Sequence, residues 1–289
     1  MSAPSSRPDR IFEGYIFDLD GTVYVGEDLL PGSARLLAAL RELGRRVIFV
    51  SNNPTRTTSQ YREKLRRLGI EVGEAEMINT VVTTVDWVTA EYPGAGVFAL
   101  AEEPLLGALR EAGVRLTDNP AEIDVVIASF DRSLDYAKLQ TAFTALWRRE
   151  QRTHFVATNP DPYCPTPSGG EPDAGSVIAA LEACTGRRCE LHFGKPGAVM
   201  MGAVLERLRV PAESCLVVGD RISTDLAAAH QIGASAAIVL TGETDAAGLA
   251  RLDAGERPAY VLGRLDEVLP AAEWQRRGWR EGDGADSRP

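Results

Sequence analysis

Strand-like and helix-like runs alternate along this chain, and that alternation constrains the fold more than any other feature of the sequence. Near the start, Tyr15–Phe17 and Val47–Val50 are short apolar runs typical of buried strands. The same rhythm returns near the end, at Cys215–Val218 and Ala236–Leu240. Strands that alternate with helices through short loops form a parallel sheet with helices on both faces. We therefore predict a doubly wound α/β fold. Its predicted helices cover Ser33–Leu43, Ser59–Leu68, Gly197–Leu208 and Leu226–Ile232.

The two halves of this predicted Rossmann-like core are separated by roughly a hundred residues, the length of a separate domain. We predict a discontinuous core of residues 10–82 and 189–270, an inserted α/β cap domain of residues 83–188, and flexible polar tails at 1–9 and 275–289. The predicted strands of the insertion are Val97–Leu100, Val125–Ala128 and Phe155–Ala157, and its predicted helices are Pro104–Ala112, Tyr136–Arg148 and Ser176–Ala183.

Charge and composition exclude several classes of partner. The 289 residues include 31 Lys and Arg against 41 Asp and Glu, a net charge of −10. This balance argues against nucleic acid or an anionic membrane as the main partner. No apolar run approaches the ~20 residues of a membrane span, and the polar segment 1–9 lacks the apolar core of a signal peptide. The four cysteines form no Cys-x-x-Cys pair, as expected of free thiols in a reducing cytoplasm. We therefore expect a cytoplasmic protein.

Two acids, Asp18 and Asp20, follow directly after the predicted strand Tyr15–Phe17. Residues i and i+2 on a strand point to the same face, and open α/β sheets bind their ligands at the carboxyl ends of strands. Because two like charges this close repel, the pair needs a cation, a shared proton or both. The pattern therefore predicts metal-assisted nucleophilic chemistry.

Three further polar motifs follow predicted strands. They are Ser51-Asn52-Asn53, Gly194-Lys195-Pro196 and Gly219-Asp220-Arg221-Ile222-Ser223-Thr224-Asp225. The motif that begins at Gly194 follows a short predicted strand at His192–Phe193. Each alone is weak evidence, since such residues also occur in ordinary turns and Asp225 could simply cap the next helix. Together, in this order and at strand ends, the four motifs predict a phosphate site.

With these residues the sequence resembles the haloacid dehalogenase (HAD) superfamily of aspartate-nucleophile phosphatases. The insertion between the second and third motifs resembles the type IIA cap of its nitrophenylphosphatase-like branch, which includes the NagD and AraL sugar-phosphatase relatives. The resemblance spans about residues 12–269. It implies that the chain is an enzyme, a phosphoric monoester hydrolase.

The resemblance also implies roles for the acids. Asp18 would be the nucleophile that forms an aspartyl-phosphate, and Asp20 would be the general acid and then the general base. Mg²⁺ would be the cofactor, held by Asp18, the backbone carbonyl of Asp20, and Asp220. Asp225 would orient the waters of the ion from a second shell.

The remaining motif residues would serve the phosphate. By the same resemblance, Ser51 and Asn52 would bind phosphate oxygens and Lys195 would neutralise their charge. Since Pro196 is a favourable first helical residue, we expect the phosphate also to meet a helix N-terminus there.

The segment 157–170 of the insertion contains four prolines and two glycines, which predicts an ordered but non-regular loop. It resembles the cap segment that closes over the leaving group in the family. Asn159 and Asp161 are therefore predicted to contact the substrate, although either side chain could instead brace the loop through its own backbone.

The expected function is that of a Mg²⁺-dependent hydrolase of a small phosphomonoester, with sugar phosphates favoured by the resemblance. Glycerol phosphate, phosphoglycolate and nucleoside monophosphates remain open as substrates, because kinship of fold does not fix the substrate. Two alternatives also remain open: a phosphotransferase or mutase with the same intermediate, and a non-catalytic receiver-like phosphate-binding module. The residues leave open whether the chain is a monomer or a homodimer.

Overall fold

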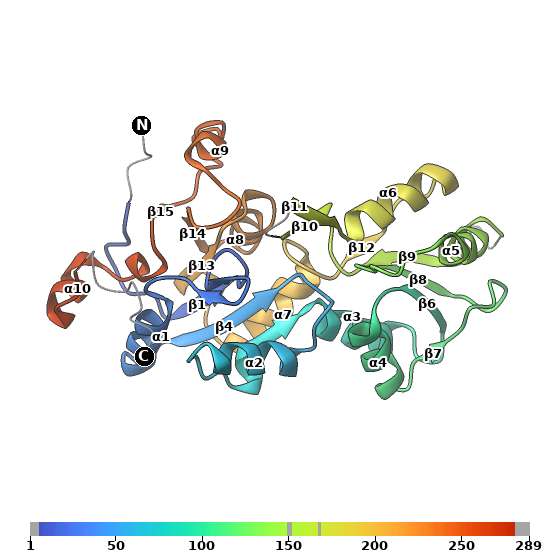
Figure 1. Ribbon diagram of the computed structural model, residues 1–289, viewed down its shortest axis with the longest axis horizontal. Coiled ribbons are helices and arrows are strands. Elements are labelled where there is room, and N and C mark those ends of the chain that lie inside the picture. The colour runs from blue at the N-terminus through green and yellow to red at the C-terminus, as the bar shows by residue number, and fades with distance from the viewer. Residues whose placement is uncertain (1–5, 149–151, 167–168, 281–289) are drawn as a thin grey trace. The chain divides into compact units, whose positions relative to one another are not determined.

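The computed structural model describes residues 6–148, 152–166 and 169–280, which Figure 1 colours by position in the chain. The chain divides into two compact units. Unit 1 is formed by Met1–Val50, Arg62–Met77 and Met201–Pro289, and unit 2 by Ser51–Tyr61 and Ile78–Met200. Among the described residues, no helix is long and apolar enough to cross a membrane.

Ten α-helices are present among the described residues. They are α1 Ser33–Glu42, α2 Thr58–Arg67, α3 Thr80–Glu91, α4 Glu103–Glu111, α5 Tyr136–Arg148, α6 Ala174–Thr185, α7 Ala198–Leu208, α8 Ala227–Ile232, α9 Ala246–Ala250 and α10 Ala271–Arg277. The strands are β1 Gly14–Phe17, β2 Tyr24–Val25, β3 Asp28–Leu29, β4 Arg46–Ser51, β5 Met77–Asn79, β6 Gly96–Leu100, β7 Arg115–Leu116, β8 Val125–Ala128, β9 His154–Ala157, β10 Tyr163–Thr166, β11 Gly169–Pro172, β12 Leu191–His192, β13 Cys215–Gly219, β14 Ser235–Val239 and β15 Tyr260–Leu262.

Unit 1 is built on a six-stranded sheet in the order β15-β14-β13-β1-β4-β5. Strand β1 is parallel to both β4 and β13, with Phe17 opposite Phe49 on one side and Val218 on the other. All four residues of β1 are buried, because neighbouring strands cover its edges and other parts of unit 1 cover its faces. The strand order runs outward from β1 in both directions, so the point where the topology reverses lies at β1 and β13. That is the point where doubly wound sheets bind ligands.

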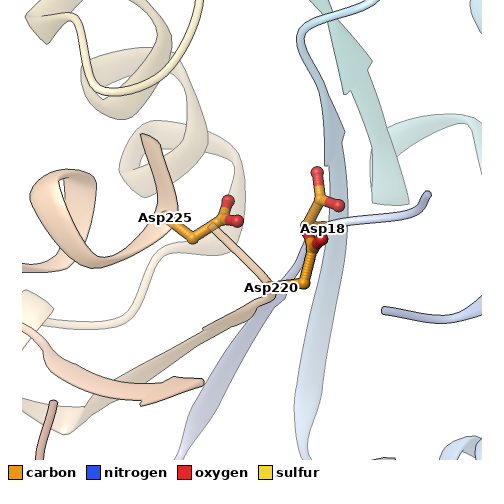
Figure 2. Close-up of side chains that lie close together, drawn as sticks. All are labelled: Asp18, Asp220 and Asp225. Carbon is orange, nitrogen blue, oxygen red and sulfur yellow. The ribbon is translucent and has the colours of Figure 1, made fainter. Parts of the chain in front are cut away.

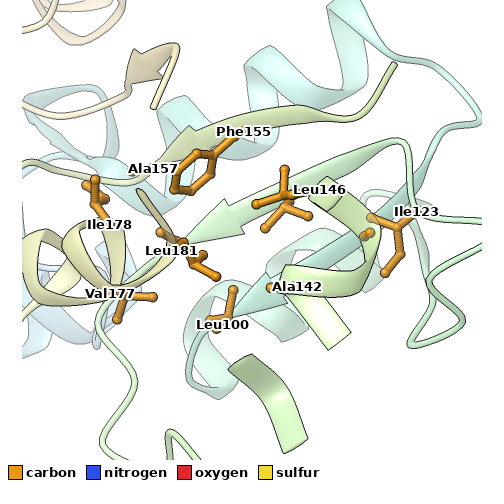
Figure 3. Close-up of a cluster of buried hydrophobic side chains, with 12 residues drawn as sticks. Leu100, Ile123, Ala142, Leu146, Phe155, Ala157, Val177, Ile178 and Leu181 are labelled. Atoms are coloured by element: carbon orange, nitrogen blue, oxygen red, sulfur yellow. The ribbon is translucent and has the colours of Figure 1, made fainter. Parts of the chain in front are cut away.

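Unit 2 is built on a separate parallel sheet in the order β12-β9-β8-β6-β7. Successive side chains of its strands point to opposite faces. Val126 and Phe155 pack on one face in a cluster with side chains of α5 and α6. Figure 3 shows Phe155 in this cluster with Leu146 of α5 and Leu181 of α6. Val125 and Val156 pack on the other face against α3 and α4. The predicted fold class, a doubly wound parallel core with an inserted α/β region, is confirmed.

The short strand at His192 is wrongly placed by the sequence prediction. It was expected in the core sheet, but β12 pairs with β9 in the sheet of unit 2, with His192 opposite Ala157. Two apolar residues carry no information about which sheet they join, because both sheets of this chain are parallel and buried. The predicted boundaries of the insertion, 83 and 188, therefore differ from the bounds of unit 2, which runs from Ile78 to Met200 and adds Ser51–Tyr61.

Helix α3 is absent from the sequence prediction, and the predicted domain boundary between residues 82 and 83 falls inside it. Its β-branched run of valines and threonines has a low helix propensity. Asn79 nevertheless caps the helix, accepting a hydrogen bond from the amide of Val82 at 3.3 Å. Val81 and Val88 are buried in the apolar cluster beneath the sheet of unit 2, so packing outweighs the weak propensity.

The segment 157–170 is also more regular than the sequence predicts. Strands β10 and β11 form an antiparallel hairpin in which Pro165 lies opposite Gly170. Proline and glycine normally mark breaks in structure, but a two-stranded ribbon has open edges on which a missing N–H is tolerated. Residues 167–168 of the predicted loop lie outside the described part of the chain.

The described parts of the two predicted tails make ordered contacts in unit 1. The amide of Ser6 donates to the carbonyl of Val261 at 3.0 Å, and Arg7 lies 4.2 Å from the ring centroid of Trp274 while it pairs with Glu267. Helix α10 continues to Arg277, inside the segment predicted as a tail. A guanidinium over an indole face adds an attraction that polarity-based reasoning does not capture. Residues 1–5 and 281–289 of the predicted tails lie outside the described residues.

Candidate active site

Three carboxylates converge at the carboxyl ends of β1 and β13 in unit 1. One oxygen each of Asp18, Asp220 and Asp225 lies within 4.8 Å of the others, as Figure 2 shows. The amide of Asp18 extends the strand ladder by donating to the carbonyl of Val218 at 2.9 Å, so the backbone of β13 fixes its position. Asp220 and Asp225 are 3% and 2% exposed. Three like charges held this closely with little solvent need a cation or a proton between them.

Glycines surround this acid triad, which we define as Asp18, Asp220 and Asp225. A Cβ on Gly21 would lie 2.6 Å from Oδ2 of Asp220, and a Cβ on Gly242 would overlap the same oxygen. A Cβ on Gly219 would overlap the carboxyl group of Asp225. The two buried carboxylates therefore occupy spaces that any larger residue at these three glycines would fill.

The segment after β14, which we call loop 240–244, holds Asp220 and the turn after Asp18. The amide of Glu243 donates to Oδ2 of Asp220 at 2.6 Å, and the hydroxyl of Thr241 donates to the carbonyl of Gly21 at 2.6 Å. Sequence reasoning missed these residues. The only available indication was their place after another predicted strand, at the end of the sheet where the motifs gather.

Arg221 ties the end of β13 to the same loop. Its amide donates to Oδ2 of Asp225 at 3.0 Å, and its Nε lies 3.1 Å from a carboxylate oxygen of Glu243. Asp225 lies within a π-helical turn, Ile222–Leu226, whose wider backbone directs its carboxylate back toward the strand end. One hydrogen-bonded group thus fixes the orientation of both buried acids.

Asp20 is exposed and stands outside the acid triad. Its Oδ2 accepts a hydrogen bond from the hydroxyl of Tyr24 at 3.3 Å. The ammonium of the buried Lys64 lies 3.6 Å from the centroid of the Tyr24 ring, a cation–π contact. The side chain of Asp20 therefore bonds to Tyr24 and is not one of the three carboxylates that converge.

In unit 2, Ser51 is the last residue of β4, and its hydroxyl lies in a small polar group. Its Oγ lies 3.1 Å from the hydroxyl of Tyr61 and accepts from the amide of Asn53 at 3.2 Å. These contacts fix the side chain of Ser51 at the end of the strand.

The side chain of Asn52 forms hydrogen bonds with Lys195 and Asp161. Its Oδ1 accepts from the amide of Lys195 at 2.7 Å, and its Nδ2 donates to the carbonyl of Lys195 at 3.0 Å. The same Nδ2 donates to Oδ2 of Asp161 at 2.8 Å. The side-chain amide predicted to bind phosphate therefore contacts protein groups at both of its ends.

Lys195 is 2% exposed and follows β12. The expectation that Pro196 opens the next helix is wrong, because α7 begins at Ala198 and a turn closed by Gly197 and Gly194 precedes it. Burial lowers the pKa of the neighbouring His192, while the carboxylates of Glu182 and Asp161 act in the opposite direction.

Asn159 and Asp161 lie together inside unit 2. They are 0% and 5% exposed, and Nδ2 of Asn159 donates to Oδ2 of Asp161 at 2.9 Å and to Oδ1 of Asp173 at 3.2 Å. The hydrogen bonds described for both side chains go to protein groups.

Comparisons with known proteins give the family of the chain. A family model described as haloacid dehalogenase-like hydrolase matches residues 15–115, and one described as HAD-hydrolase-like matches residues 192–268. Sugar-phosphatase AraL of Bacillus subtilis is 32% identical over 260 residues, which cover 90% of this chain and 93% of AraL.

Two solved structures extend the comparison to the fold. A p-nitrophenyl phosphatase from Archaeoglobus fulgidus is 35% identical with a TM-score of 0.81, covering 89% of this chain and 97% of its own. A glycerol phosphate phosphatase from Mycobacterium tuberculosis, in complex with magnesium, is 28% identical with a TM-score of 0.79. The match covers 89% of this chain and 76% of the relative's chain.

The fold and these comparisons define a phosphatase of the haloacid dehalogenase type. The chain belongs to the haloacid dehalogenase-like hydrolases, in their type IIA branch of NagD-, AraL- and p-nitrophenylphosphatase-like phosphatases.

Proposed function

We propose that this phosphatase is a Mg²⁺-dependent hydrolase of small phosphomonoesters and that it works through an aspartyl-phosphate on Asp18. The observation that carries the proposal is the convergence of three carboxylates at the ends of β1 and β13. Oxygen-only ligands in such a group suit Mg²⁺, which binds few carboxylates and keeps several waters. The glycines around Asp220 and Asp225 leave space for carboxylates and nothing larger, which also fits an ion site.

Asp18, the backbone carbonyl of Asp20, and Asp220 would hold the ion, and Asp225 would hold it directly or through its waters. When bound, Mg²⁺ offsets the negative charge of the phosphoryl group and of the carboxylates around it. The solved relative from M. tuberculosis, with magnesium bound, supports this choice of ion.

Two residues of unit 1 carry the covalent chemistry in this proposal. A carboxylate oxygen of Asp18 attacks phosphorus, the bond from phosphorus to the ester oxygen breaks, and Asp20 donates a proton to the departing alkoxide. Asp20 then takes a proton from water, and the resulting hydroxide attacks the phosphorus of the aspartyl-phosphate. Inorganic phosphate leaves and the carboxylate of Asp18 is restored. The position of Asp20 apart from the acid triad supports its role as the acid and base.

Residues of unit 2 serve the phosphate group. The hydroxyl of Ser51 binds a phosphate oxygen, and the ammonium of Lys195 neutralises phosphate charge. Phosphoryl transfer depends mainly on such positioning and charge compensation. We further propose that the predicted core, 10–82 and 189–270 apart from β12, is catalytic and that the predicted insertion, 83–188, together with β12, is the cap that limits the substrate to small molecules.

Sugar phosphates are the proposed substrate class, and glycerol phosphate is the next candidate. The support comes from two relatives: a sugar phosphatase at 32% identity and a glycerol phosphate phosphatase at 28% identity. The net charge of −10 makes a small anion held by a local cation such as Lys195 a better fit than an extended polyanion.

A panel of small phosphomonoesters tests the proposal. We expect phosphate release that requires Mg²⁺ and is abolished by a chelator, with higher kcat/KM on sugar or glycerol phosphates than on nucleoside monophosphates. The measurement is inorganic phosphate released per minute for each member, with and without Mg²⁺. Release that appears only after an alcohol acceptor is added would instead identify a phosphotransferase. A phosphorylated protein that never turns over would identify a receiver-like module.

A further inference from the structure

A hydrogen-bonded network in unit 2 joins two segments that lie far apart in the sequence. Asn52 follows β4, and Asp161 follows β9, yet Nδ2 of Asn52 donates to Oδ2 of Asp161 at 2.8 Å. The same side chain holds both backbone groups of Lys195, the amide at 2.7 Å and the carbonyl at 3.0 Å. Asn52 therefore links a buried carboxylate to the backbone of a buried lysine.

The carboxylate of Asp161 reinforces the orientation of the Asn52 amide that the backbone of Lys195 also favours. An ionised carboxylate only accepts hydrogen bonds, whereas a carboxamide has a donor end and an acceptor end. Asp161 therefore favours the orientation in which Nδ2 of Asn52 faces it, and this orientation turns Oδ1 toward the amide of Lys195. The reversed orientation would set the NH₂ group against the N–H of Lys195, lose both bonds to that residue, and turn Oδ1 toward the carboxylate of Asp161.

The network is anchored on the side away from Lys195. Asn159 donates to Asp161 at 2.9 Å and to Asp173 at 3.2 Å, and Asp173 caps α6 by accepting from the amide of Ala174 at 2.5 Å. The carbonyl of Asp161 accepts from the amide of Gly175 at 2.8 Å. Asp161 is thus held rigidly by the first turn of a helix.

The network is also closely packed at its other end. A Cβ on Gly194 would lie 2.6 Å from Oδ1 of Asn52 and 2.9 Å from a methyl carbon of Thr80. The hydroxyl of Thr80 donates to the carbonyl of Asn52 at 2.8 Å. The absence of a side chain at Gly194 therefore leaves the space that the side chain of Asn52 occupies.

We infer that Asp161 is a positioning residue for the phosphate end of the substrate, acting through Asn52 on the backbone of Lys195. This inference rests on the proposed role of Lys195 in neutralising phosphate charge. It reassigns Asp161 from the leaving-group contact predicted by sequence to a support of the group that every phosphomonoester shares. Asn159 belongs to the same support, because it holds the carboxylate that orients Asn52.

The two roles predict different effects of substitution. A residue that contacts the leaving group changes the ranking of substrates and leaves inorganic phosphate unaffected, since phosphate has no leaving group. Substitution of a residue that positions Lys195 weakens the binding of all phosphomonoesters and of inorganic phosphate by a similar factor. Inorganic phosphate is therefore the probe that separates them.

The test compares wild type, Asp161→Ala and Asp161→Asn with saturating Mg²⁺. Asp161→Ala is expected to raise the Kd of inorganic phosphate, measured by calorimetry, about tenfold, as expected for the loss of charge-assisted hydrogen bonds. KM should rise by a similar factor for an aryl and an alkyl phosphate, with their ranking unchanged. Asp161→Asn keeps one acceptor oxygen for Asn52, so it should return the Kd to within about threefold of wild type.

Asp131→Ala is the matched control. Asp131 is another buried carboxylate of unit 2, 7% exposed, which accepts from the amide of Ser133 at 2.9 Å and from Lys138 at 2.6 Å. Its removal costs comparable packing without touching Asn52 or Lys195, so the Kd of phosphate should stay at the wild-type value. If Asp161→Ala does not fold, Asn52→Ala removes the same link from the other side and should raise the Kd by at least the same factor.

The outcomes separate this inference from the proposed function. An Asp161→Ala variant that changes the substrate ranking but binds phosphate normally would overturn the inference in favour of a leaving-group contact. Lys195→Met supplies the reference. If Lys195→Met binds phosphate more weakly but Asp161→Ala binds it normally, the inference about Asp161 is wrong and the proposed role of Lys195 stands. If Lys195→Met binds phosphate normally, the proposed role of Lys195 is wrong.

Discussion

Asp18→Asn is expected to lower the rate of phosphate release by about a thousandfold or more, because the variant lacks the proposed nucleophile and with it the covalent route. An asparagine has the shape of the aspartate but lacks the charge and the nucleophilic oxygen. The measurement is kcat on the best substrate of the panel, at saturating Mg²⁺. Trapping the intermediate by rapid acid quench should give a phosphorylated protein for wild type and none for the variant.

The same substitution has a second expected effect that does not depend on turnover. Asp18 is one of three carboxylates whose oxygens lie within 4.8 Å of one another, so removing its charge relieves repulsion in the metal-free protein. The melting temperature without Mg²⁺ should rise, and the further rise on adding Mg²⁺ should shrink. Asp86→Asn, at an exposed position on α3, is the matched control and should change neither quantity.

A near-normal rate in Asp18→Asn would exclude attack by this carboxylate. If phosphate release is lost but the melting temperature responds to Mg²⁺ as in wild type, Asp18 remains the proposed nucleophile but is not a ligand of the metal. These two properties can be lost separately, so the single variant tests both assignments.

The core of the fold could be predicted because its strands carry strong local patterns. Residues 14–17 form a wholly buried strand that ends in polar residues, and Cys215–Gly219 repeats the pattern at β13. Parallel strands in a doubly wound sheet end at a common edge, so acids that follow two such strands meet. The sequence therefore predicts that Asp18, Asp220 and Asp225 lie at one end of the sheet, where the structure has them.

Elements with weak local patterns could not be predicted. Strand β12 has two residues, and only its pairing with β9 shows that Lys195 follows a strand of unit 2. Helix α3 has the composition of a strand and is stabilised by burial of Val81 and Val88. In both cases a tertiary contact decides the structure, and the residues alone do not contain it.

The partners of the site residues were the hardest to predict. The sequence indicates that Asn52 and Asp161 are polar residues after strands, but not that they bond to each other across more than a hundred positions. Loop 240–244 had no recognised motif, although Thr241 and Glu243 bond to groups around the acid triad. Motifs identify the groups that react, whereas the residues that orient those groups are found only when the chain is folded.

Gly242→Ala is the second substitution with a large expected effect, and it tests whether loop 240–244 sets the metal site. The added methyl group would overlap Oδ2 of Asp220, so the carboxylate or the loop must move. Either movement breaks the bond from the amide of Glu243 to Asp220, now 2.6 Å long. Loss of such an orienting contact typically weakens metal affinity by about 10- to 100-fold. We expect the Mg²⁺ concentration for half-maximal activity to rise by that factor.

Gly202→Ala controls for the general cost of adding a methyl group to unit 1. Gly202 lies within α7, and a Cβ there would meet nothing within 4 Å. Alanine in a helix interior is favoured over glycine by roughly 0.5–1 kcal/mol, so this variant should melt slightly higher and respond to Mg²⁺ like wild type. Melting curves over a Mg²⁺ titration give a readout that does not require turnover. If Gly242→Ala keeps the wild-type response to Mg²⁺ in both assays, loop 240–244 does not position Asp220, and the acid triad must hold its ion without that support.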